Sequence, residues 1–110
     1  MSINKVILIG NVGSDPDIRY PEKDFVVARL SLATNERRGE SNAEVTEWHT
    51  LMLTGSNARI AERYVRKGSK LYVEGHLRYR EYEDKFKIQR RVAVIDVTVM
   101  ELLGRQSTQN

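Results

Sequence analysis

Apolar and polar residues alternate over most of this chain, and a period of two is typical of β-strands with one buried face. The alternation runs through residues 4–12, 25–34 and 46–54, and residues 70–82 and 86–103 suit two further, longer strands. In the first segment, Val6 and Leu8 face one way while Ile7 and Ile9 face the other. A chain of 110 residues is long enough for one hydrophobic core, so we expect the five strands to share it.

A single helix is predicted over residues 56–67, between the third and fourth strands. Apolar residues recur there at spacings of three and four, which places them on one helix face. That face would consist of Ile60, Ala61, Tyr64 and Val65. Ser56 or Asn57 can cap the start of the helix, and Gly68 can adopt the left-handed conformation that closes its end.

The resulting order, β-β-β-α-β-β, is that of an OB-fold. We therefore predict an all-β domain over residues 1–104, a five-stranded Greek-key barrel with one short helix between strands 3 and 4. Gly10, Gly13 and residues 14–17 should end the first strand. Residues 35–44 hold no large apolar side chain and should form a solvated, mobile loop. Residues 83–85 suit the tip of a projecting hairpin, and residues 105–110 a short, polar, disordered tail.

Composition argues against catalysis and against a membrane location. The chain has no cysteine and only two histidines, His49 and His76, which excludes thiolate chemistry and all-histidine metal sites. No nucleophile has a paired base, so we expect no enzymatic activity, catalytic residue, metal or other cofactor. The longest apolar run near the N-terminus covers residues 6–9, too short for a membrane span or a signal peptide, which predicts a cytoplasmic protein.

Positive charge is concentrated in the second half of the chain. Residues 1–55 carry 6 basic and 8 acidic side chains, whereas residues 56–110 carry 12 basic and 7 acidic ones, which gives the net charge of +3. The predicted hairpin over residues 78–91 holds 6 basic and 3 acidic residues, interleaved with Tyr79, Tyr82 and Phe86. Such a surface can bind phosphates while its aromatic rings stack on bases.

Two strand faces carry candidate binding residues. Trp48 shares one face of the third strand with Thr50, Met52 and Thr54. One face of the fourth strand carries Arg78, Arg80 and Tyr82. Purely structural interpretations remain open for both sets, because a tryptophan is often buried and arginines often pair with glutamates across strands.

Several short blocks of sequence occur in an order known from one family. They are NKVILIGN at residues 4–11, DP at 15–16, RY at 19–20, LAT at 32–34, TEWH at 46–49, YVRKGS at 64–69, VEG at 73–75 and LR at 77–78. Over residues 4–104 the chain thus resembles the bacterial single-stranded-DNA-binding proteins. The resemblance implies an OB-fold, a homotetramer, no enzymatic activity, and sequence-tolerant binding and protection of single-stranded DNA in replication, recombination and repair, in the cytoplasm on the nucleoid.

The resemblance also implies roles for individual residues. Trp48 and Tyr82 match the family's stacking aromatics, and His49 matches a position close to a subunit interface. The family's basic contacts to the DNA backbone match Lys5, Arg19, Arg66, Lys67, Arg78 and Arg80. Arg38 and Thr54 match two further positions of the family's DNA-binding site, but they depart from its pattern, since a tryptophan and a phenylalanine are frequent there.

The expected partners are single-stranded DNA and further copies of this chain, with no membrane. Family members often recruit replication and repair proteins through an acidic tip, but residues 104–110 hold no carboxylate side chain, so this recruitment is not expected. Two alternatives remain open. One is an interaction scaffold, primosome-like or conjugation-associated, with weak DNA affinity, which the departures at Arg38 and Thr54 favour. The other is an RNA-binding OB module, because stacking surfaces tolerate either nucleic acid.

Overall fold

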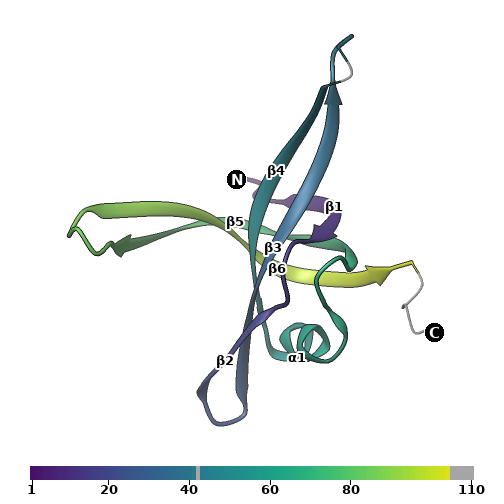
Figure 1. Ribbon diagram of the computed structural model, residues 1–110. Helices are drawn as coiled ribbons and strands as arrows, with labels where there is room; N and C mark the ends of the chain where they lie inside the picture. Colours follow the sequence, from purple (N-terminus) through teal and green to yellow (C-terminus); the bar gives the residue numbers. More distant parts are fainter. Residues whose placement is uncertain (42, 105–110) are drawn as a thin grey trace.

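The computed structural model describes residues 1–41 and 43–104, so the tail predicted over residues 105–110 lies outside the described residues. The elements are β1 (Val6–Val12), β2 (Asp17–Glu22), β3 (Phe25–Arg38), β4 (Ala43–Thr54), α1 (Gly55–Tyr64), β5 (Lys70–Glu83) and β6 (Gln89–Leu103). The strands form one sheet in the order β1-β5-β6-β4-β3-β2, and β1 also pairs with β3 (Figure 1). This second pairing closes five of the strands into a barrel, which confirms the predicted OB-fold.

Two long hairpins extend beyond the barrel (Figure 1). β3 and β4 stay paired as far as Arg38 and Ala43, and β5 and β6 as far as Glu83 and Gln89. The prediction of a mobile loop over residues 35–44 was therefore wrong for most of that segment. All of its described residues are exposed, on both faces of the hairpin, so no alternation of polarity marked it as strand.

The start of the chain also differs from the prediction. β2 was missed because five of its six residues are exposed and one is Pro21, features of an edge strand. Gly10 does not end the first strand but lies inside β1. Asn4, just ahead of β1, bonds to β5 through its side chain. Its amide oxygen accepts from the N–H of Leu77 at 2.8 Å, and its amide nitrogen donates to the carbonyl of Leu77 at 2.9 Å. These two bonds take the place of the backbone bonds of a strand pair.

The hydrophobic core fills the inside of the barrel, and α1 covers one end of it (Figure 1). The helix buries Ala58 and Ala61, followed by Val65. Ile60 and Tyr64 were predicted to belong to the buried face, but they are 39% and 50% exposed. The small alanines let the helix backbone approach the strands closely, which leaves the larger side chains at the margin of the contact.

The ends of α1 are also placed differently. Thr54 is the N-cap residue, with an extended backbone and no side-chain hydrogen bond, so Ser56 and Asn57 lie within the first turn. Gly68 has a positive φ of 92°, as predicted, but it lies in the turn before β5 rather than at the helix end. Within the described residues, no helix is long and apolar enough to cross a membrane.

Gly10 marks the point where β1 passes from β5 to β3, and a Cβ added there would overlap the carbonyl oxygen of Ala33. We predict that Gly10→Ala lowers the free energy of unfolding by about 1 to 3 kcal/mol, because one backbone must move away from the other. Urea denaturation measures this change. Ser31→Ala, at an exposed position of β3, is the control and should stay within about 0.5 kcal/mol of the wild type. Equal stability of the two variants would show that closure does not depend on Gly10.

Candidate nucleic-acid interface

One outer face of the β3–β4 pair carries the predicted tryptophan. Its β4 residues are Trp48, Thr50, Met52 and Thr54, which lie opposite Ala33, Ser31, Arg29 and Val27 of β3. The prediction that these four β4 residues lie on one face is therefore confirmed. Trp48 is 62% exposed, so the interpretation as a core residue was wrong.

Trp48 packs over the end of β1. A Cβ added at Gly13 would overlap the indole ring, so the absence of a side chain there leaves the space that the ring occupies. The N–H of Gly13 donates to the carbonyl of Ser31 at 2.9 Å, which fixes this glycine against β3. The exposed ring is thus supported by the barrel on one side.

Arg66 and Lys67 lie near the same end of β1. The N–H of Gly68 donates to the carbonyl of Val12 at 2.7 Å, and the N–H of Lys67 donates to the carboxylate of Asp15 at 2.8 Å. These bonds hold the turn after α1 beside the strand that supports the tryptophan. The turn that carries Arg66 and Lys67 is therefore held at the end of β1 over which Trp48 packs.

A groove separates this face from the β5–β6 hairpin. It consists of two adjoining hollows of about 500 and 540 Å³, which share Met52 and Arg80 in their lining. Its charged, aromatic and hydroxyl-bearing side chains include Phe25, Arg29, Thr54, Arg80, Tyr82 and Asp96. Three predicted site residues from different parts of the chain, Thr54, Arg80 and Tyr82, thus line one groove.

Sequence analysis did not assign Arg29, Met52 or Asp96 to the site. Met52 was correctly predicted to share the face of Trp48. Which residues lie beside it in the groove depends on the parallel pairing of β4 with β6, which sets Met52 opposite Asp96. The two residues are far apart in sequence, and no local pattern indicates such a pairing.

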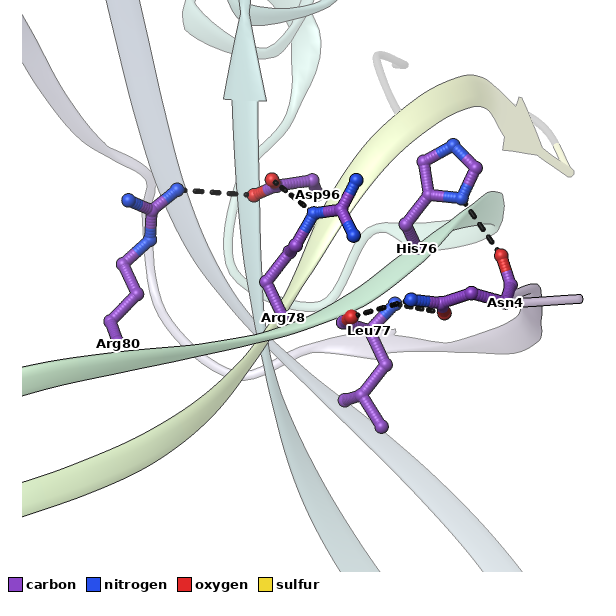
Figure 2. A network of polar contacts seen from close by, with 6 residues as sticks. All are labelled: Asn4, His76, Leu77, Arg78, Arg80 and Asp96. Carbon is purple, nitrogen blue, oxygen red and sulfur yellow. Dashed lines mark hydrogen bonds and ion pairs between the residues drawn. The ribbon is translucent and has the colours of Figure 1, made fainter. Parts of the chain in front are cut away.

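The two predicted arginines of β5 share one carboxylate (Figure 2). Nη2 of Arg80 lies 3.3 Å from one oxygen of Asp96, and Nε of Arg78 lies 3.7 Å from the other. The cross-strand partner of these arginines is therefore an aspartate of β6 and not one of the neighbouring glutamates.

Three other predicted residues lie outside the lining of the groove. Lys5 is 3.4 Å from the carboxylate of Glu74, and the pKa of Glu74 is lowered by a hydrogen bond from the Tyr72 hydroxyl together with the charge of Lys5. Arg19 pairs with its neighbour Asp17 at 3.3 Å. His49 lies on the inner face of the β3–β4 pair, where its Nε2 is 2.9 Å from Oγ1 of Thr34.

Arg38 lies at the far end of the β3–β4 hairpin. The register pairs Arg38 with Ala43 and Arg37 with Glu44. Because side chains alternate along a strand, Arg37 shares the face of Trp48 and Arg38 lies on the opposite face. Sequence analysis did not place Arg37 on this face, because its orientation depends on how far the pairing of β3 with β4 continues.

Asp84 organises the tip of the β5–β6 hairpin next to Tyr82. Its carboxylate accepts the N–H groups of Phe86 and Ile88 at 2.8 and 3.0 Å and the Nε–H of Arg90 at 2.8 Å. The bond from Ile88 contributes most, and together these bonds lower the pKa of Asp84. Since Arg90 lies opposite Tyr82, the carboxylate orders the strand beside the candidate stacking residue.

We predict that this tip loosens in acid. A lowered pKa means that the carboxylate stabilises the tip above the ordinary pKa of an aspartate and that this stabilisation is lost as the pH falls through the lowered value. Protection factors for the amides of Phe86 and Ile88, measured by NMR hydrogen exchange, should therefore drop at acid pH. In Asp84→Ala, which removes the acceptor, they should be low throughout, and protection in the wild type that does not change with pH would contradict the assignment.

An OB barrel with exposed aromatic rings and arginines along one open face belongs to a class of nucleic-acid-binding modules. Comparison with known proteins identifies the family. The chain matches the Single-strand binding protein family over residues 3–103, and it belongs to that family. Membership confirms the resemblance found in the sequence and supports the prediction that the chain is not an enzyme.

Individual relatives agree with this assignment. The chain is 43% identical over 105 residues to a single-stranded DNA-binding protein of Xanthomonas campestris pv. campestris, and 44% identical over 109 residues to one of Bacteroides thetaiotaomicron. These alignments cover 93% and 94% of this chain but 61% and 68% of the relatives, so the chain spans less than two thirds of the Xanthomonas protein. A solved structure described as "Plasmodium falciparum SSB complex with ssDNA" has a TM-score of 0.85 and 32% identity, covering 94% of this chain and 97% of that one.

Proposed function

We propose that this chain binds single-stranded DNA without strong base preference and protects it in replication, recombination and repair, in the cytoplasm on the nucleoid. The observation that carries the proposal is the groove, which joins Arg80 and Tyr82 to the face of β4 that bears Trp48. The names of the relatives and of the solved complex support the choice of ligand.

In this proposal, one strand follows the groove and then the outer face of β4. Met52, in the groove, and Trp48 lie four residues apart on one face of β4, a distance of about 13 Å. A strand leaving the groove beside Tyr82 would reach Trp48 and then the turn that carries Arg66 and Lys67. Bases can stack on the two aromatic rings only if they are unpaired, so the site favours single strands over duplex.

Fluorescence anisotropy of labelled oligo-dT tests this function. We predict that Trp48→Ala weakens binding by about 1 to 3 kcal/mol with little change in its salt dependence, because a stacking ring is lost and no charge is removed. Ile60→Ala, at an exposed position of α1 outside the groove, is the control and should bind like the wild type. Equal affinity for duplex DNA of the same length would contradict the proposal, and tighter binding of oligo-U would favour the RNA-binding alternative.

A second candidate function is an OB-fold interaction scaffold with weak DNA affinity. The ion pairs of Arg78 and Arg80 with Asp96 favour it, because paired arginines are less available to phosphates. Failure of the wild type to bind oligo-dT at low salt would support this candidate.

Assembly with further copies of the chain, as a tetramer by family resemblance, is part of the proposal. Ile7, Ile9 and Val99 are 53%, 51% and 41% exposed on the outer face of β1 and β6, on either side of β5. Ile7 and Ile9 are neighbours on β1, while Glu74 of β5 lies between Ile7 and Val99. Exposed apolar side chains that lie side by side, like the two isoleucines, occur in protein interfaces. The position of His49 near an interface rests on the family resemblance alone.

We predict that analytical ultracentrifugation finds an oligomer of the 12.7 kDa chain and that Ile9→Glu dissociates it, because a carboxylate would be buried in the interface. Ile60→Glu, at an exposed apolar position of α1, should leave the mass unchanged. A wild type that sediments as a single chain at micromolar concentration would contradict the assignment of this face.

A further inference from the structure

Asp96 is the only acidic residue among the described residues that line the groove. Its side chain is 37% exposed, so solvent and ligands can reach it. Arg78 and Arg80 both approach it from β5, and Figure 2 shows the carboxylate between the two guanidinium groups. Two positive groups of the binding face therefore share one negative group.

The backbone fixes the carboxylate in this place. Asp96 lies opposite His76 on the same sheet face as both arginines, whose own cross-strand partners are Val92 and Val94. The arginine side chains therefore extend along the strand toward Asp96 rather than to their direct neighbours. Asp96 pairs with His76 of β5 and with Met52 of β4, so its backbone is held on both sides.

We propose that Asp96 occupies the place of a DNA phosphate between Arg78 and Arg80 and acts as an internal competitor that limits the affinity for single strands. The inference rests on the proposed function. A carboxylate and a phosphate accept hydrogen bonds from the same guanidinium donors. With Asp96 present, an incoming phosphate meets a local charge of +1 in place of +2, and it must displace or share the carboxylate.

The geometry favours competition over a positioning role. Each arginine makes one ion-pair contact, at 3.3 and 3.7 Å, and neither contact is the double hydrogen bond that fixes a guanidinium in one orientation. Both arginine side chains are more than half exposed, and ion pairs of that kind stabilise a protein by about 0 to 1 kcal/mol. A phosphate can therefore replace the carboxylate at little cost, while the remaining negative charge still opposes its approach.

Asp96→Asn removes the charge and keeps the shape of the side chain. We expect it to bind oligo-dT more tightly than the wild type, by up to about fivefold at low salt. The slope of log affinity against log salt should become steeper by up to about 0.7 for each additional phosphate that the arginines neutralise. Asp96→Ala should change both quantities in the same direction, which provides a second variant if the first one unfolds.

Two controls separate this effect from a change of net charge. Glu101→Gln alters the net charge equally on the same strand, opposite Tyr72 and away from both arginines, and should leave the affinity and the slope unchanged. In an Arg78→Gln/Arg80→Gln background, Asp96→Asn should not increase the affinity for oligo-dT, because the guanidinium groups for which the carboxylate and the phosphate compete are absent.

Unchanged or weaker binding by the folded Asp96 variants would overturn the inference, and so would an equal gain in Glu101→Gln or in the background without the arginines. A wild type that binds no oligo-dT at low salt overturns the proposed function as well. Binding by the wild type with no gain in Asp96→Asn overturns only the inference.

Discussion

Closure of the barrel depends on two places where the backbones of neighbouring strands meet with no side chain between them. At Gly10, β1 lies against the carbonyl of Ala33, and at Gly75, β5 lies against the carbonyl of Asp96. The first approach allows β1 to pair with β5 and β3 together. The second coincides with a shift in register after Glu74, where β6 carries the extra residue Thr98, since glycine in a strand often marks a bulge or a close approach.

The candidate site is a consequence of this closure. Once the ring is closed, β4 and β6 meet in a short parallel pairing that places Met52 opposite Asp96. The outer face of one hairpin is thereby set beside the outer face of the other, and the groove lies between them. Neither hairpin alone could bring Thr54 near Arg80, so the core residues that hold the ring closed also determine the geometry of the binding face.

The sequence alone predicted the parts of the fold in which one face of a strand is buried and the other is exposed to solvent. It separated Val6 and Leu8, which pack against the core, from Ile7 and Ile9 on the other face of β1, and it found the face of β4 that carries Trp48. It failed where both faces are exposed, as at the end of the β3–β4 hairpin, because polarity then carries no information on strand structure. Arg38 illustrates the consequence, since the face of a side chain depends on a register that polar residues do not reveal.

The site was predictable to the extent that it follows from residue types within one strand. Arg80 and Tyr82 could be placed on one face of β5 by alternation alone, and they do line the groove. Asp96 could not be assigned, because its role depends on a pairing between distant segments and on the length of two arginine side chains. A prediction of binding residues from basic and aromatic patterns finds the groups that attract DNA and overlooks those that oppose it.

Ion pairing changes what the basic residues of this chain can contribute. Four of the six basic positions that the family resemblance assigns to the DNA backbone are each paired with a carboxylate, namely Lys5, Arg19, Arg78 and Arg80. Arg66 instead donates to the backbone carbonyls of Glu62 and Val65. A phosphate that binds one of the four paired groups exchanges one anion for another, and such an exchange yields less free energy than binding an unpaired cation. Exposed aromatic rings have no such competitor, so stacking on Trp48 and Tyr82 should carry a larger share of the affinity than the number of basic residues suggests.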